Sequence, residues 1–337
     1  MSKGHVIVEE LLYLKMASTL TVADIQTMLS SIVGEISGID TEEREYTSIE
    51  GLWSFELDNG KKGKSKGGKG TKGKGGKGTK GKGAATKMTM DKGADGKGEE
   101  LAWYADAFDY WEDEANCPIS DDGVLGGYGS LTPNDVRGSN QFLDKVKSLR
   151  PALQFDRVAD CGAGIGRVTK HLLLPRCARV DLVEQSPRLI KAAPGYVGAA
   201  DAGRLTCITL GLQDFSPAPG TYDIIWIQWV IGHLHDLDFI AFFRRCAAGL
   251  RPGGIIALKD NCVEAYTFVV DKSDSSVARH PEYHKLLFTL AGLTVVWEQL
   301  QTDFPTELYP VMMWALAPAL DTQQPAEAST TVFRAPV

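Results

Sequence analysis

The most chemically informative residues lie close together in residues 158–167. This stretch combines one acid, three glycines and one base: Asp160, Gly162, Gly164, Gly166 and Arg167. Glycines there permit a tight turn and let a ligand approach the backbone, where a Cβ would block it. The spacing is G-x-G-x-G, one residue short of the G-x-G-x-x-G pattern that places a pyrophosphate on a helix N-terminus. The turn therefore favours a ligand other than NAD.

Two acids flank this glycine turn. Asp160 directly precedes it, and Glu184 ends the next apolar run, residues 180–183. An acid at the second position suits the two hydroxyls of a ribose. An acid before the turn suits a ligand that carries positive charge rather than phosphate. S-adenosyl-L-methionine, a nucleoside with an amino group, a carboxylate and a sulfonium, meets both conditions and is the predicted cofactor.

The elements that must position these residues alternate from residue 156 onward. Seven strands are predicted, at 157–160, 179–183, 205–210, 222–228, 254–260, 293–301 and 312–317. Helices are predicted at 139–149, 168–173, 187–193, 237–249 and 281–291. Apolar runs such as 224–227 suit strands covered on both faces. The alternation indicates an α/β fold with right-handed crossovers and a mostly parallel sheet, whose ligands bind beyond the carboxyl ends of the strands.

Polar residues follow five successive strands of this predicted sheet. They are Asp160 with the glycine turn; Glu184, Gln185 and Ser186; Gln213 and Asp214; Gln228, Trp229 and His233; and Lys259, Asp260 and Asn261. One such strand end is weak evidence, but five on the same edge indicate a ligand site. Trp226 lies in the middle of its strand and is expected in the core. His171, His280 and His284 are expected at the surface.

Composition excludes several classes of site. The six cysteines form no C-x-x-C pair and have no histidine at metal spacing, so they are predicted to be free buried thiols in a reducing compartment, and no metal site is expected. No run of eighteen apolar residues is present, so no membrane span is expected. The first residues lack the layout of a signal peptide.

Charge is distributed unevenly over the 337 residues. Residues 61–82 hold ten lysines and no acids, and without them 26 basic residues face 43 acidic ones. The body is therefore acidic, which disfavours nucleic acid on the folded part and favours a cationic substrate. The Gly/Lys stretch at 60–83 is either an electrostatic arm for nucleic acid or an acidic partner, or a solvated linker.

Four segments follow from these patterns. Residues 1–59 are expected to be a helical appendage with helices at 6–16 and 22–36, and residues 60–99 a disordered linker. Residues 100–317 form the catalytic domain, opened by a segment dense in aromatic residues at helical spacing, and residues 318–337 form a disordered tail.

Several longer motifs make a resemblance specific. The Gly-Gly-Tyr-Gly at 126–129, the glycine turn at 161–167, and the segments 226–233, 259–261 and 274–279 are similar to the protein α-N-terminal methyltransferases, a class I S-adenosylmethionine-dependent family. The resemblance covers roughly residues 104–317. It implies a Rossmann-like fold, with a mostly parallel seven-stranded sheet flanked by helices and an N-terminal helical lid. The family methylates the α-amine of proteins that expose Xaa-Pro-Lys or Xaa-Pro-Arg, so a cytoplasmic or nuclear location is expected.

The resemblance also implies roles for individual residues. Gly162 and Arg167 would hold the methionine carboxylate end of the cofactor. Glu184, where the family usually has Asp, would bind the ribose, while Leu212 and Gln213 would frame the adenine. Gln228 would touch the methionine portion. Gly164, Gln185 and Ser186 complete the predicted cofactor-binding set.

The implied substrate channel is acidic and aromatic. Its lining would comprise Trp229, Asn261, Asp271, Asp274 and Ser276, with Leu125, Gly126 and Tyr309 around the mouth. Trp229 would pack against the substrate proline, and Asp271 and Asp274 would attract the lysine or arginine that follows it.

Methylation of an α-amine requires a general base. Such an amine has a pKa of about 7.7–8.0 and is largely protonated at neutral pH, so it cannot attack until a proton leaves. His233 and Asp274 are both candidates for this base, and Asn261 would orient the amine. Two alternatives remain: a methyltransferase acting on a small amine or another metabolite, and a non-catalytic cofactor-binding protein whose lysine arm recruits nucleic acid.

Overall fold

A computed structural model describes residues 20–32, 36–59, 97–263 and 267–319. The predicted helix at 6–16, the lysine-rich stretch at 60–83 and the end of the tail lie outside these residues. Within the described part of the chain, no helix is long and apolar enough to cross a membrane.

The main sheet has seven strands in the order β10-β11-β7-β6-β3-β4-β5. Their bounds are β3 Arg157–Cys161, β4 Arg179–Glu184, β5 Leu205–Thr209, β6 Tyr222–Gln228, β7 Leu250–Asn261, β10 Leu293–Leu300 and β11 Val311–Pro318. Strands β3 to β7 pair in parallel, whereas β11 pairs antiparallel with both β7 and β10. All seven predicted strands and the Rossmann-like class I fold are confirmed.

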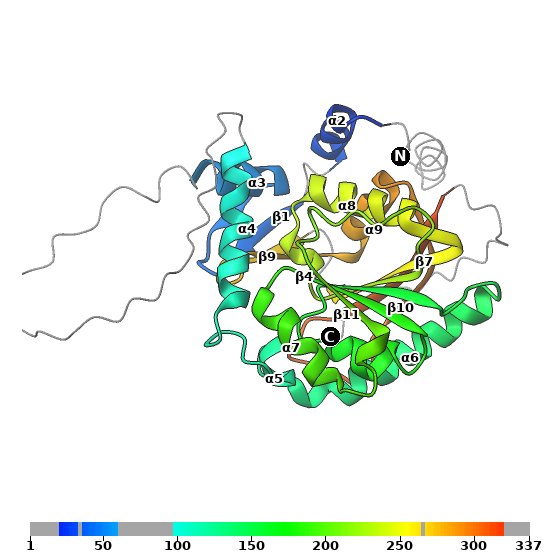
Figure 1. Ribbon diagram of the computed structural model, residues 1–337. Coiled ribbons are helices and arrows are strands. Elements are labelled where there is room, and N and C mark those ends of the chain that lie inside the picture. The colour runs from blue at the N-terminus through cyan, green and yellow to red at the C-terminus, as the bar shows by residue number, and fades with distance from the viewer. Residues whose placement is uncertain (1–19, 33–35, 60–96, 264–266, 320–337) are drawn as a thin grey trace, which may run out of the picture.

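Helices cover both faces of this sheet (Figure 1). One face carries α8 (Asp236–Gly249) and α9 (Pro281–Leu290), and the other carries α6 (Thr132–Leu149), the π-helical turn η3 (Thr169–Leu173) and α7 (Pro187–Val197). Shorter turns are α5 (Asp121–Val124), η2 (Gly129–Leu131), η4 (Ala202–Arg204) and η5 (Ile231–His233). The sheet is therefore buried between two helical layers, which explains its continuous apolar runs.

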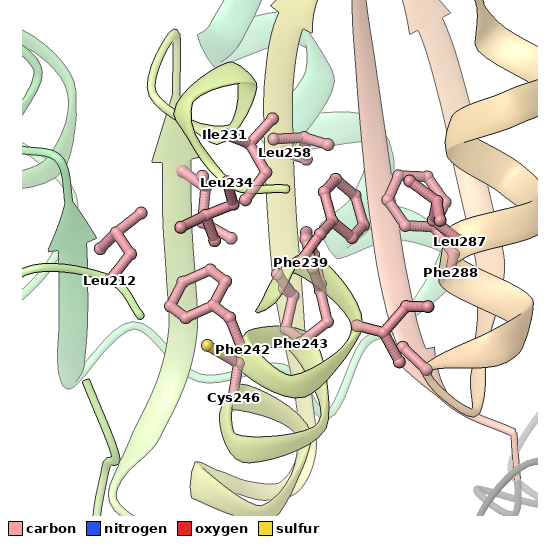
Figure 2. Close-up of a cluster of buried hydrophobic side chains, with 14 of the residues drawn as sticks. Leu212, Ile231, Leu234, Phe239, Phe242, Phe243, Cys246, Leu258, Leu287 and Phe288 are labelled. Atoms are coloured by element: carbon pink, nitrogen blue, oxygen red, sulfur yellow. The ribbon is translucent and has the colours of Figure 1, made fainter. Parts of the chain in front are cut away.

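Aromatic side chains fill the layer between α8, α9 and the sheet (Figure 2). The rings of Phe239 and Phe243 stack with centroids 4.6 Å apart, and both approach Phe288 of α9. On the opposite face, Trp226 is buried edge-to-face against Phe142, as expected for a core residue. Such rings bury large apolar areas, so these clusters anchor the helices that approach the ligand edge.

A second sheet joins the N-terminal segment to the catalytic domain. It has the order β2-β1-β8-β9, with β1 Ser37–Asp40, β2 Glu45–Tyr46, β8 Thr267–Asp271 and β9 Ser276–Arg279. Helix α3 (Ile49–Asn59) contacts β2 of this sheet and packs against α4 (Lys97–Glu112), whereas α2 (Val22–Ile32) packs against α8. The sequence interpretation placed only helices before residue 60 and missed these four strands. Helix α4 also begins within the segment expected to be a linker.

Two of the three histidines expected at the surface are buried, so that expectation is wrong for them. The ring of His280 accepts a hydrogen bond from the Glu282 backbone N–H at 3.1 Å and caps α9. His284 lies 5.1 Å from the ring of Trp314, and burial lowers its pKa to about 3. Both side chains are therefore buried around α9 and do not face solvent.

Candidate active site

Two adjoining cavities open at the carboxyl edge of the main sheet. The first is lined by the glycine turn, by the residues that follow β4 and β6, and by α4. Eight of the nine predicted cofactor residues line it: Gly162, Gly164, Arg167, Glu184, Gln185, Leu212, Gln213 and Gln228. The ninth, Ser186, does not line this cavity; its Oγ accepts a hydrogen bond from the Leu189 N–H at 3.1 Å and caps α7.

The glycine turn is held against the end of β4. Gly162 and Gly164 have φ values of +71° and +55°, which favour glycine. The Glu184 carboxylate accepts hydrogen bonds from the backbone N–H groups of Gly164 and Ser186, each at 2.9 Å. Burial raises the pKa of Glu184, and these bonds oppose that rise. The acid is therefore fixed at the wall of the first cavity.

Substitution of Gly162 by alanine tests the requirement for a bare backbone. An added Cβ would lie 2.6 Å from Val230, so we expect overpacking of about 1–3 kcal/mol and a loss of cofactor affinity of about tenfold. Gly220→Ala is the matched control, because Gly220 has a φ of +64° and open space around the added Cβ. Calorimetric titration with S-adenosylhomocysteine should separate them; equal affinities would contradict the expectation.

Asp160 does not line either cavity, which corrects the idea that it meets a charged ligand. It is only 2% exposed, and its carboxylate accepts a hydrogen bond from the Thr169 hydroxyl at 2.6 Å. Burial raises its pKa to about 6. The hydrogen bond between Asp160 and Thr169 instead links the end of β3 to the turn η3, which lie on either side of the glycine turn in the sequence.

Asp135 of α6 is the hub of a buried charge network that sequence reasoning missed. Its carboxylate contacts Arg167 at 2.7 Å, the Gln228 amide at 2.9 Å and the Lys259 ammonium at 2.5 Å. The Lys259 ammonium also donates to Gln301 at 2.6 Å. Two cations face one anion in this network, and Arg167 lines the first cavity. The surplus positive charge is complementary to the carboxylate of a ligand.

The second cavity brings together every predicted substrate and catalytic residue. Its lining includes Leu125, Gly126, Trp229, His233, Asn261, Asp271, Asp274, Ser276 and Tyr309. Asp260, interpreted as structural, also lines it; burial raises its pKa to about 7. Trp111, Val124, Trp229 and His233 line both cavities, so the two spaces meet at these side chains.

Both ring nitrogens of His233 have hydrogen-bond partners. Its Nε2 lies 3.1 Å from the indole nitrogen of Trp111, and its Nδ1 lies 3.0 Å from the backbone oxygen of Ser275. An indole N–H only donates and a carbonyl only accepts, so Nε2 is the acceptor and Nδ1 carries the proton. The Nε2 lone pair of His233 is therefore already engaged by Trp111.

Asp274, unlike His233, has a side-chain oxygen without a hydrogen-bond partner. Its Oδ1 is buried and has no hydrogen-bond partner among the described residues. Burial raises the pKa of this carboxyl, while a hydrogen bond with Ser276 opposes the rise. Asp274 thus lines the second cavity and has a buried carboxylate oxygen without a partner, which makes it a candidate proton acceptor.

Trp229 and Asn261 meet where the two cavities join. Trp229 has a φ of +52°, an uncommon value for a bulky residue, and the centroid of its ring lies 6.4 Å from that of Phe304. The indole N–H of Trp229 donates to Asn261 Oδ1 at 3.1 Å. That oxygen keeps a second lone pair for another donor.

Helix α4 supplies several residues of the site that the sequence did not predict. Tyr104, Ala107 and Trp111 line the first cavity, and the Trp103 indole N–H donates to the backbone oxygen of His233 at 2.7 Å. The helical spacing of the aromatic residues was the available signal, but it did not show which element α4 packs against.

Among the described residues, no cluster of three metal-ligating side chains is present.

Comparison with known proteins assigns the chain to a family. A family model described as AdoMet dependent proline di-methyltransferase matches residues 99–317. The chain belongs to this family. It is 44% identical over 220 residues to N-terminal Xaa-Pro-Lys N-methyltransferase 1 of Danio rerio, covering 65% of this chain and 96% of the relative. It is 39% identical over 284 residues to alpha N-terminal protein methyltransferase 1 of Dictyostelium discoideum, covering 83% of this chain and 90% of the relative.

A solved structure supports the same assignment. A SAM-dependent methyltransferase of Leishmania major superposes with a TM-score of 0.65 at 33% identity, covering 83% of this chain and 96% of that one. As a member of the proline di-methyltransferase family, the chain is a methyltransferase that uses S-adenosyl-L-methionine. The bare glycine turn, the fixed acid Glu184 and the surplus charge around Arg167 fit a ligand with a ribose and a carboxylate.

Proposed function

We propose that this enzyme methylates the α-amino group of proteins with an exposed N-terminal Xaa-Pro-Lys or Xaa-Pro-Arg sequence. The observation that carries the proposal is the buried, unpartnered Oδ1 of Asp274 beside a second acid, Asp271, in a cavity that adjoins the cofactor cavity. A cavity with these acids suits a substrate that brings both an amine and a cationic side chain. The names of the two relatives above support the same substrate class.

The geometry favours Asp274 over His233 as the general base. The Nε2 of His233 already accepts a hydrogen bond from Trp111, so the imidazole would have to lose this bond before accepting a proton. Asp274 has a free oxygen and a raised pKa, which brings it nearer to that of the amine. In this proposal, His233 positions the loop that carries Asp274 through its bond to the Ser275 backbone.

The remaining residues position the substrate. We assign Asn261 Oδ1 to orient the amine, Trp229 to pack against the substrate proline, and Asp271 to attract the following cation. Arg167, Glu184 and Gln228 would hold the cofactor, which supplies the electrophilic methyl group when bound. Asp274 would take the proton from the amine, which frees the nitrogen lone pair to accept that methyl group. Alignment of these groups carries much of the rate.

A labelled-cofactor assay tests the substrate class. With tritiated S-adenosyl-L-methionine, we expect label on an Xaa-Pro-Lys peptide and none on the same peptide with an acetylated N-terminus. Mass spectrometry of the product then gives the number of methyl groups. Label on free small amines but not on the peptide would instead support the small-molecule alternative.

A further inference from the structure

The loop that joins β8 to β9 contains a cation between its two acids. Lys272 lies between Asp271 and Asp274 in the sequence, yet its ammonium contacts Glu56 Oε2 of α3 at 2.5 Å. The Lys272 and Glu56 side chains are 24% and 11% exposed, so the pair is partly shielded from solvent. A residue of the N-terminal segment thus determines where the charge of Lys272 lies.

The partner of Lys272 is itself held in place. The Tyr46 hydroxyl lies between two acids, 2.8 Å from Asp40 Oδ2 and 3.3 Å from Glu56 Oε1, and its single proton is shared between them. Asp40 is 4% exposed and also accepts from the backbone N–H of Arg44 at 2.9 Å. The N-terminal segment therefore presents a preorganised anionic site to Lys272.

Backbone contacts fix the same loop from the same side. Strand β1 pairs in parallel with β8, and the backbone N–H of Thr41 donates to the Val270 oxygen at 3.0 Å. The Lys272 N–H donates to the Thr41 hydroxyl at 3.1 Å. The first residues of the loop are thus tied to β1, which leaves the Lys272 side chain on the Glu56 side.

The two acids of the loop lack an ion-pair partner within the described residues. Asp271 Oδ1 accepts from the Ser273 backbone N–H at 2.8 Å and from the Ser273 hydroxyl at 2.6 Å, and Asp274 interacts with Ser276. Both acids line the second cavity. A lysine ammonium on a flexible chain is a mobile point charge. Released from Glu56, it would act on Asp271, its neighbour in the chain, within the screening length.

We propose that Glu56 is a specificity-determining positioning residue: it holds the Lys272 ammonium away from Asp271, so that this acid stays available to the cationic side chain of a peptide substrate. The inference rests on the proposed function. It assigns the N-terminal segment 36–59 a part in substrate selection without contact with the substrate.

The test compares two peptides that differ only in charge at the third residue, Xaa-Pro-Lys and Xaa-Pro-Gln. In Glu56→Gln, we expect KM for the lysine peptide to rise about three- to tenfold with kcat little changed, because the freed Lys272 competes for Asp271. KM for the glutamine peptide should stay constant. The double variant Glu56→Gln, Lys272→Met should restore the wild-type KM. Glu50→Gln, at an exposed position of the same helix, is the matched control.

Each outcome decides a separate question. A wild-type enzyme that is inactive on the lysine peptide overturns the proposed function, and this inference with it. An active wild type with an unchanged KM in Glu56→Gln overturns the inference alone. A rise in KM for both peptides that Lys272→Met does not reverse would indicate a merely structural role for Glu56, and would equally overturn the inference.

Discussion

Replacement of Asp274 by asparagine is expected to lower kcat by about 10²- to 10⁴-fold, the range that general-base catalysis contributes. The amide keeps the size of the side chain and its contact with Ser276 but cannot accept the proton of the amine. Affinity for S-adenosylhomocysteine should stay near the wild-type value, because Asp274 lines the second cavity and not the first. Steady-state kinetics with the lysine peptide and calorimetric titration measure the two effects.

Asp271→Asn is the matched comparison, since it removes a neighbouring charge of the same loop. For this variant we expect a higher KM for the lysine peptide and a nearly unchanged kcat. The pH profile adds a further check. Burial raises the pKa of Asp274 above its usual 3.8, and only the ionised form accepts a proton, so activity should fall as pH drops through that raised value. An Asp274→Asn enzyme with wild-type kcat would exclude the carboxylate from the mechanism.

The main sheet and the cofactor turn could be predicted because their signals are local. Each strand from β3 to β7 is a run of apolar residues that ends in a polar group, and parallel pairing brings those ends to one edge. Glu184, Gln228 and Asn261 could therefore be assigned to the site from the sequence alone, because each lies at or next to the end of a predicted strand. The substrate residues on the β8–β9 loop came from the resemblance to a family, since no periodicity marks them.

The missed features depend on partners distant in the sequence. Strands β1 and β2 have 4 and 2 residues and pair with each other, but β1 joins the rest of its sheet through β8, more than two hundred positions later. Short strands of this kind take their stability from tertiary pairing rather than from propensity. Asp135 lies within an amphipathic helix, where an acid normally faces solvent. Its burial is explained only by Arg167 and Lys259, which come from other elements.

Replacement of Asp135 by asparagine is expected to lower the free energy of unfolding by about 3–5 kcal/mol, because it leaves two buried cations without their anion. The Asp135 and Lys259 side chains are 2% and 0% exposed, so water cannot compensate. Burial disfavours the charged form of Asp135, yet Lys259 and Arg167 outweigh it and hold its pKa below the usual value. Its stabilising effect should accordingly be lost only as pH falls through that lowered value. Urea unfolding measures the change.

Asp201→Asn is the control for this prediction, because Asp201 pairs with Arg204 at 2.7 Å while both side chains remain more than a third exposed. An ion pair of that kind contributes at most about 1 kcal/mol. Asp135→Glu retains the charge and should lie between the two. Cofactor affinity should also fall in Asp135→Asn, because Arg167 and Gln228 lose the carboxylate that orients them. Equal unfolding midpoints for Asp135→Asn and Asp201→Asn would show that the network around Asp135 does not hold the site together.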